Sequence, residues 1–322
     1  MYYPYLRGRQ NELLSLKELL DKNKLSEKVT PVVEPVRWSS TFISTLKKFV
    51  EKERDIIIIR NPEVGRFYKE YMEAIDKSET ESSPEKRARL KASIAGYNEL
   101  LQDSHVIEAY INNQALLEKI RAEELSVTNC FLINKNRGDF EFYEDFGNDL
   151  SSKAALVPNS MDFIDVVDDD KILLEDGFSR AKRNVDYIDN ADEFFSKNHL
   201  VYERRGYIGF SDYSIVGDEY EESGFAPFAV AIHLVYFNEK KELRVHHFVS
   251  DSNKNASDPG GKFGEAVEKL AKWVEGHNLK KTEGLNELLD YYKSGKFPGL
   301  GVIKKLSIKH HIELIGDFEE NA

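Results

Sequence analysis

The stretch DIIIIRNP, residues 55 to 62, decides the fold class. Its four consecutive isoleucines are apolar on both faces of an extended chain, a pattern typical of a parallel strand that helices cover. The run ends in the polar group Arg60-Asn61-Pro62, where a loop is expected to begin. We therefore expect an α/β protein with a parallel sheet, in which this run is the third strand.

Two strand and helix pairs precede that run. The first combines YYPYL (residues 2–6) with a leucine-rich helical pattern at residues 9–23. The second combines VTPVVEPV (residues 29–36) with a helical pattern at residues 39–53, where Ser39 or Ser40 is the expected N-cap. The chain thus alternates strand and helix from its first residues onward.

The segment after the third strand, from Val64 to Ser126, is almost wholly helical in pattern. A polar run around Pro84 interrupts it, which favours a helical hairpin inserted after the third strand. Five more strand candidates follow: TNCFLIN from Thr128, AALVP from Ala154, KILLEDGF (171–178) or the nearby DFIDVV (162–167), YIGFSDYS from Tyr207, and FAVAIHLVYF from Phe225.

These candidates bring the number of strands to that of a TIM barrel, so we expect a (β/α)8 TIM-barrel-like fold. FAVAIHLVYF and ELRVHHFVSD (242–251) predict a β-hairpin, with which the barrel would close through an antiparallel irregularity. Residues 190–203 read as helical. We expect a barrel domain over residues 1–276, with residues 64–126 as an insertion, and C-terminal helices over residues 277–322 packed on the barrel.

The composition excludes several classes of protein. A formal net charge of -12 argues against general binding to nucleic acid or anionic lipid, because lysine and arginine drive such binding. The single cysteine, Cys130, can form neither an intramolecular disulfide nor a cysteine-based metal site. The N-terminal residues do not resemble a signal peptide, and no run approaches the length of a membrane span. A cytoplasmic location is expected.

Several motifs are shared with a known family. YYPYLRGRQNELL, TPVVEP, IIIIRNP and GFSDYSIVG, followed by the predicted hairpin, resemble the phage-associated Beta protein family, in particular a bacterial branch that begins with YYPYLRG. The resemblance runs from Tyr2 to about Trp273. Members of the family are carried on phages, phage satellites and mobile elements, which implies a role in bacterial conflict such as antiphage defence. The resemblance carries no catalytic residues over to this chain.

Nearly every expected strand ends in a polar group. In α/β barrels the functional side chains lie at the C-terminal ends of the strands, so distant residues are expected to meet at one rim. The set comprises Arg7, Glu34, Arg60, Asn61, Asn134, Lys135, Asn159, Glu175, Asp176, Asp212, Tyr213, His246 and His247. The alternative is that such side chains only cap the helices that follow.

Within this set, Glu34, Asp212 and His246 are the candidate catalytic acid and base groups. Arg7 and Arg60 could clamp a carboxylate or phosphate through paired guanidinium hydrogen bonds, or could instead form ordinary ion pairs with Glu34 or Asp212. The remaining candidate ligand-binding residues at the rim are Asn61, Lys135, Asn159 and Tyr213. The adjacent histidines 246 and 247 must point to opposite faces of a strand, so at most one is expected to face the pocket. No HxH or HExxH spacing supports a metal site, and none is predicted.

A glycine-containing loop is a second candidate site. Gly260, Gly261 and Lys262 precede a helix whose free amides could hold a phosphate, although a plain Asp258-Pro259-Gly260 turn is the alternative. Further helices are expected at residues 264–276, 285–293 and from 300 to the end. His310 and His311 are expected on a half-exposed face of the last helix, without a role.

Two functions from different classes fit these features. The first is an enzyme that acts on an anionic, phosphate-bearing small molecule or nucleotide at the rim. The second is a sensor or scaffold without catalysis, which binds a neighbour-encoded partner protein through the helical insertion. The sequence indicates no cofactor for either.

Overall fold

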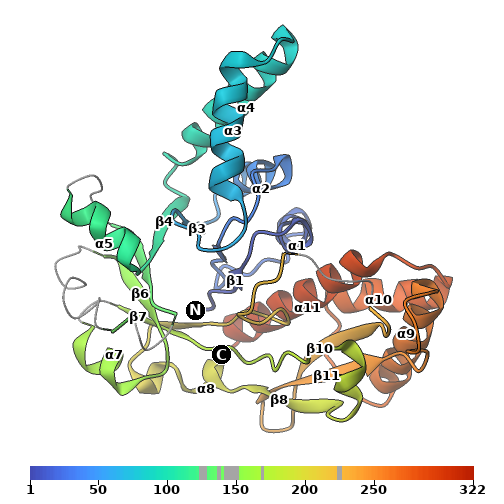
Figure 1. Ribbon diagram of the computed structural model, residues 1–322. Coiled ribbons are helices and arrows are strands. Elements are labelled where there is room, and N and C mark those ends of the chain that lie inside the picture. Colours follow the sequence, from blue (N-terminus) through green and yellow to red (C-terminus); the bar gives the residue numbers. More distant parts are fainter. Residues whose placement is uncertain (123–128, 136–138, 141–151, 168–169, 223–226) are drawn as a thin grey trace. The chain divides into compact units, whose positions relative to one another are not determined.

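The computed structural model describes residues 1–122, 129–135, 139–140, 152–167, 170–222 and 227–322 (Figure 1). The chain divides into two compact units. The first comprises Met1–Leu20, Thr30–Glu175 and Tyr202–Ser211, and the second comprises Asp21–Val29, Asp176–Val201 and Asp212–Ala322. The expected limits at Ser126, Thr128 and Phe225 lie outside the described residues.

The first unit is a barrel of eight parallel strands in sequential order. The strands are β1 (Tyr5–Leu6), β2 (Val32–Val33), β3 (Ile56–Ile59), β4 (Val106–Ile111), β5 (Phe131–Ile133), β6 (Ala154–Val157), β7 (Lys171–Leu174) and β9 (Gly209–Ser211). A parallel bridge between Tyr2 and Phe210 joins the last strand to the first, and Tyr3 N donates to Phe210 O at 2.8 Å. The predicted TIM-barrel-like fold is confirmed.

The barrel needs a glycine at the seam where it closes. A Cβ atom on Gly209 would lie 2.6 Å from Cε2 of Tyr3 and 2.8 Å from the carbonyl oxygen of Met1. Real Cβ atoms do not approach other atoms so closely, so only glycine lets the Tyr3 ring pass this point of β9.

Helices alternate with these strands. They are α1 (Gln10–Asp21), α2 (Ser40–Glu51), α3 (Phe67–Thr80), α4 (Pro84–Leu100), α5 (Gln114–Arg121) and α7 (Met161–Val166), with a short 3-10 turn η3 (Glu203–Arg205) before β9. Ser39 caps α2 as expected, because its hydroxyl accepts a hydrogen bond from Phe42 N at 3.2 Å. Phe42, Leu46 and Phe49 form the fully buried stripe of that helix.

Two strand assignments were wrong. The fourth barrel strand, β4, lies inside the segment that was expected to be almost wholly helical, although the helical pair α3 and α4 does follow β3 as predicted. The hairpin strand expected from Phe225 is not part of the barrel, which closes without an antiparallel strand. KILLEDGF supplies β7, whereas DFIDVV falls within α7.

The second unit contains a three-stranded antiparallel sheet in the order β10-β11-β8. Its elements are the turn η2 (Asn184–Ile188), β8 (Asp192–Ser196), α8 (Asn198–Val201), β10 (Ala231–Phe237), β11 (Leu243–Val249), α9 (Pro259–Glu275), α10 (Glu283–Ser294) and α11 (Leu300–Glu320). The predicted hairpin is confirmed as β10 and β11. The helical interpretation of residues 190–203 was wrong for residues 192–196, because their apolar pair Phe194-Phe195 lies in an edge strand paired with β11.

One face of this sheet packs against the three C-terminal helices. Ile232 and Leu234 of β10 and Phe248 of β11 share a core with Phe263 of α9 and Leu306 of α11. Helices on both sides of residue 276 thus cover the same sheet, while the expected division into residues 1–276 and 277–322 stays a prediction. Among the described residues, none of the helices combines the length and apolar content needed to cross a lipid bilayer.

The two histidines of the last helix are buried rather than half-exposed. His310 Nε2 lies 2.7 Å from the carbonyl oxygen of Val235, and its Nδ1 lies 2.7 Å from the Thr282 hydroxyl. His311 Nε2 lies 3.1 Å from Oδ1 of Asp212. The expectation failed because α11 is buried on most of its circumference, which a helical pattern alone does not reveal.

Candidate functional site

A buried carboxylate, Glu34, is the centre of a polar cluster at the end of the barrel strands. Its Oε2 atom accepts a hydrogen bond from the Tyr5 hydroxyl at 2.7 Å, forms an ion pair with Arg7, and lies 3.5 Å from Nζ of Lys135. Its Oε1 atom accepts a hydrogen bond from Glu63 N at 2.8 Å. We call these five residues the mouth cluster.

The mouth cluster lies inside the ring of strands. Tyr5 lies in β1 and Arg7 directly follows this strand, so the two residues are expected on the same face of the extended chain. Lys135 follows β5, on the other side of the ring in strand order. Nζ of Lys135 lies 5.9 Å from the centroid of the Tyr5 ring, and Cζ of Arg7 lies 5.1 Å from it. Because β1 and β5 are not neighbours in the sheet, these contacts cross the barrel interior.

Glu34 is held in its ionised form. Burial by itself raises the pKa of this carboxyl group, but the charges of Lys135 and Arg7 and the hydrogen bonds from Tyr5 and Glu63 N outweigh it, so the pKa lies below its usual value. An ionised carboxylate with all these donors is suited to orient both cations. This geometry favours a positioning role for Glu34 over that of a general base.

Lys135 is the cation of the cluster that solvent reaches most readily. Its side chain is 16% exposed, compared with 6% for Arg7 and 0% for Glu34. Its Nζ also pairs with Oε2 of Glu63 at 3.0 Å, and the Glu63 side chain is 39% exposed. The outer side of Lys135 therefore meets a carboxylate that lies partly in solvent.

Asparagine side chains tie the ends of neighbouring strands together beside this cluster. Asn61 exchanges two hydrogen bonds of 2.8 Å with the backbone of Ile111. Asn112 Nδ2 donates to Oδ1 of Asn134 at 2.9 Å, and Asn134 Nδ2 donates to the carbonyl oxygen of Leu156 at 3.2 Å. These side-chain amides form hydrogen bonds with backbone and side-chain groups at the strand ends. They therefore hold together the ends of the strands next to Lys135.

Arg60 is not part of the mouth cluster. Its guanidinium forms an ion pair with Glu108 of β4, whose second oxygen accepts a hydrogen bond from the Tyr110 hydroxyl at 3.1 Å. Glu108 pairs in register with Ile58, and Ile58 pairs with Val33, the residue before Glu34. Because side chains alternate along a strand, Glu108 and Glu34 are one residue out of phase. The structure does not form the expected clamp of Arg7 and Arg60, because the two guanidinium groups have different carboxylate partners.

The other rim candidates are divided between the two units. Asn159 is exposed after β6. Asp212 and Tyr213 are buried in the second unit, where Asp212 Oδ1 accepts a hydrogen bond from Ser214 N at 2.8 Å. Glu175 is the last residue of the segment Thr30–Glu175 of the first unit. Asp176 is in the second unit, and burial raises its pKa to about 6.

The glycine loop at the start of α9 is capped by its own side chain. Oδ1 of Asp258 accepts a hydrogen bond from Gly261 N at 2.9 Å, and Nζ of Lys262 donates to the carbonyl oxygen of Asn255. Gly260 follows Asp258 within the first turn of the helix. The turn interpretation therefore accounts for this loop, since a carboxylate of the chain already fills the place at the amides that a phosphate would take.

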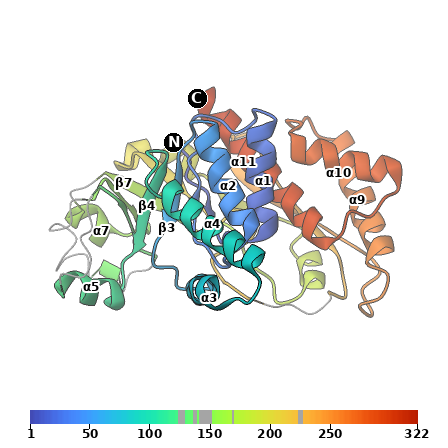
Figure 2. The same cartoon turned by 90° about the horizontal axis from the view of Figure 1, so that it is seen from above.

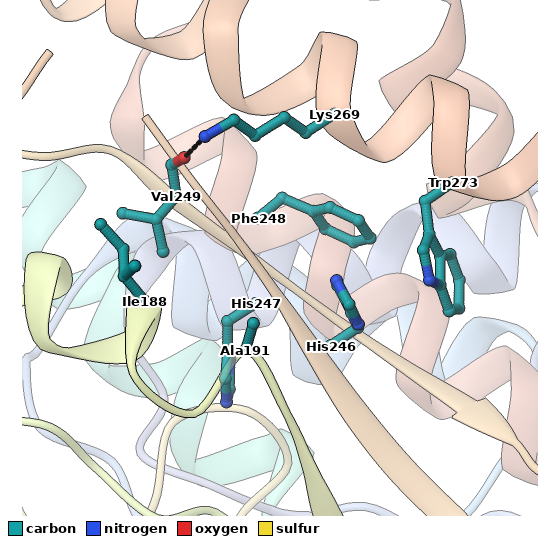
Figure 3. Close-up of a pocket in the computed structure, with 8 residues that line it drawn as sticks. All are labelled: Ile188, Ala191, His246, His247, Phe248, Val249, Lys269 and Trp273. Atoms are coloured by element: carbon teal, nitrogen blue, oxygen red, sulfur yellow. Dashed lines mark hydrogen bonds between the residues drawn. The ribbon is translucent and has the colours of Figure 1, made fainter. Parts of the chain in front are cut away.

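His246 and His247 point to opposite faces of β11, as predicted. His246 Nδ1 lies 3.0 Å from Oδ2 of Asp192, whereas His247 Nδ1 lies 2.7 Å from Nδ1 of His233. Burial lowers the pKa of His247 to about 4, so this imidazole is neutral. Both histidines nevertheless line a pocket of about 220 Å³ in the second unit, together with Ile188, Ala191, Phe248, Val249, Lys269 and Trp273 (Figure 3). The expectation that at most one of them faces a pocket was therefore wrong.

Tyr5, Glu63, Asp192 and Trp273 belong to these two sites and were missed by the sequence analysis. Tyr5 could have been found, because it precedes Arg7 by two residues and so shares its face of a strand. Glu63 and Asp192 carry no such signal, since their partners are distant in sequence. Within the described part of the chain, no three His, Cys, Asp or Glu side chains come together as a metal site needs.

No family model, no curated protein and no solved structure matches this chain.

Proposed function

We propose that the mouth cluster binds the anionic group of a small molecule at the C-terminal end of the barrel strands. The observation that carries the proposal is the convergence of Arg7, Glu34 and Lys135 from three separate strands inside the ring. Active sites of barrels of this type lie at this end of the strands.

The charges support this proposal. Taking charged groups out of water costs several kcal/mol for each ion, and an apolar layer would fill a barrel interior at no such cost. Arg7 and Lys135 together carry one positive charge more than Glu34. Glu63 balances that excess from a partly exposed position, so an incoming phosphate or carboxylate could take its place at Lys135.

Lys135 and Glu63 give the proposal a test with opposite outcomes. We expect Lys135→Ala to weaken binding of inorganic phosphate about tenfold or more, because a hydrogen bond to a charged group contributes about 1.5–3 kcal/mol. Glu63→Gln should tighten the same binding, because it removes the competing carboxylate. Isothermal titration calorimetry with phosphate and pyrophosphate measures both, with Lys47→Ala on the exposed face of α2 as the control.

Equal phosphate affinities in wild type, Lys135→Ala and Glu63→Gln would contradict the proposal, because they would show that the mouth cluster is not an anion site. Lys135→Arg is the conservative variant and should keep most of the binding, since the positive charge remains.

We propose that the chain acts in bacterial conflict, in the cytoplasm. The resemblance to the Beta protein family supports the role. The single cysteine supports the location, because it suits a reducing compartment. In bacteria that express the chain, we expect fewer plaques for at least one phage of a diverse panel. Lys135→Ala should restore plaque numbers at equal protein level. Equal plaque numbers with and without the chain across the panel would count against this setting.

A second candidate function is a partner-binding scaffold built on α3 and α4. These helices lie side by side and extend away from the barrel strands (Figure 1), and α4 lies beside α2 (Figure 2). Tyr97 is the only residue of α4 that is buried, and Tyr68 and Met72 of α3 are exposed. Introducing a charge with Met72→Glu would abolish such an association and leave phosphate binding at the mouth cluster unchanged.

A further inference from the structure

The pocket in the second unit has walls of two kinds. Figure 3 shows His246, Trp273 and Phe248 on one side and Ile188 and Ala191 on the other. The His246 and Trp273 rings are stacked, with centroids 4.9 Å apart and planes inclined by 27°. The pocket is thus bounded by aromatic rings on one side and aliphatic groups on the other, which suits a flat ring.

His246 is fixed in one orientation by Asp192. This carboxylate accepts hydrogen bonds from the Tyr236 hydroxyl at 2.7 Å and from Nε of Arg244 at 2.5 Å, in addition to its contact with His246 Nδ1. Burial raises the pKa of Asp192, but these donors and the charge of Arg244 outweigh it, so the pKa lies below its usual value. Asp192 therefore only accepts hydrogen bonds, and the proton lies on Nδ1 of His246.

The chemistry of the pocket edge follows from that tautomer. With Nδ1 protonated, Nε2 of a neutral His246 is a hydrogen-bond acceptor, and none of the described residues donates to it. Lys269, by contrast, is a hydrogen-bond donor. Its ammonium donates to the carbonyl oxygen of Val249 and to Oδ1 of Asp251, both at 2.7 Å, and carries a third N–H. A ligand with a hydrogen-bond donor toward His246 Nε2 and an acceptor toward Lys269 would complement both groups.

We propose that this pocket binds a flat heteroaromatic ring with an amino or N–H donor beside an acceptor on its edge, which is the chemistry of a nucleobase. The volume of about 220 Å³ is smaller than the roughly 300–1,000 Å³ of pockets for drug-sized ligands, so a single ring system fits. Pockets lined mainly by aromatic and aliphatic side chains, with a few polar groups that fix orientation, are a general way in which proteins hold small ring systems. The site is separate from the mouth cluster, which is in the other unit.

Trp273 allows a direct measurement. The chain has two tryptophans, Trp38 and Trp273, so Trp38→Phe leaves the pocket tryptophan as the only one. In this full-length variant we expect saturable quenching of tryptophan fluorescence by at least one of adenosine, guanosine, cytidine and uridine. Cyclohexanol, which has a six-membered ring like a pyrimidine base but is not aromatic, should not quench.

Variants in the same background assign the binding to the pocket. Ala191→Leu narrows the pocket without touching His246 and should abolish binding, and His246→Ala should weaken it about tenfold through loss of one hydrogen bond. His277→Ala is the matched control, because His277 stacks on Trp273 at 3.9 Å but does not line the pocket. Circular dichroism confirms that each variant is folded.

Two results would overturn the proposal. One is the absence of saturable quenching by all four nucleosides. The other is quenching with the same affinity in Ala191→Leu and His246→Ala as in Trp38→Phe alone, which would place any binding elsewhere. Failure of phosphate binding at Lys135 would leave this proposal unaffected, so the two tests are independent.

Discussion

Replacing Glu34 with alanine is expected to lower the free energy of unfolding by about 3–5 kcal/mol, the cost of breaking a buried ion pair by removing one partner. Glu34 is fully buried, and its carboxylate is shared by Arg7, Lys135 and the Tyr5 hydroxyl. Without it, the interior of the barrel would retain two cations that have lost the anion between them. Urea denaturation followed by circular dichroism measures the change.

Glu63→Ala is the matched control for this variant. Glu63 contacts the same ammonium group as Glu34, at 3.0 Å, but its side chain is 39% exposed. Exposed ion pairs contribute only about 0–1 kcal/mol, so the control should lose little stability. Similar losses in both variants would show that Glu34 is not the buried centre of the cluster.

The same carboxylate predicts a pH dependence. Its pKa in the folded protein lies below the usual value of 4.5, so the folded state binds its proton more weakly than the unfolded state does. The stability that Glu34 contributes is therefore present above pH 4.5 and is lost as the pH falls through the lower folded value. The difference in stability between wild type and Glu34→Ala should shrink over that acidic range.

Gly284→Ala should lower the free energy of unfolding by about 3 kcal/mol, at the upper end of the usual cost of overpacking. Gly284 lies in the first turn of α10 at its crossing with α11. A Cβ atom there would collide with the carbonyl oxygen of Leu306 and lie 2.7 Å from the backbone nitrogen of His310. These are backbone atoms, so the collision is relieved only by moving one helix away from the other.

Gly264→Ala in α9 is the control for the glycine variant. No atom lies within 4 Å of the place that its Cβ would take, so alanine should raise stability by up to about 1 kcal/mol through its higher helix propensity. Thermal unfolding of the two variants should shift in opposite directions. A Gly284→Ala protein as stable as wild type would contradict the close helix crossing.

The fold class could be predicted because Ile56 to Ile59 are apolar and buried on both faces of the strand. This pattern is typical of a parallel strand that helices cover. The fourth strand could not, because VIEAYI has Glu108 and Tyr110 among its apolar residues and lies between two helical patterns. The hairpin was recognised from its own residues. Its place in a separate sheet depends on pairing with β8, which local patterns do not encode.

The candidate site was predicted in part. Arg7, Glu34 and Lys135 were expected at the rim because each follows a strand, and the structure brings these three together. Arg60 was expected with them but pairs with Glu108, because the partner of a side chain depends on the face of the strand to which it points. The roles could not be predicted, since the low pKa of Glu34 arises from neighbours distant in sequence.

A double-mutant cycle between Glu34 and Lys135 tests the central claim most directly, namely that residues from distant strands meet inside the barrel mouth. Free energies of unfolding are measured for wild type, Glu34→Gln, Lys135→Met and the double variant. The structure predicts a coupling energy of about 1–3 kcal/mol between the two sites. Additivity within about 0.5 kcal/mol would contradict it, because residues without contact behave independently.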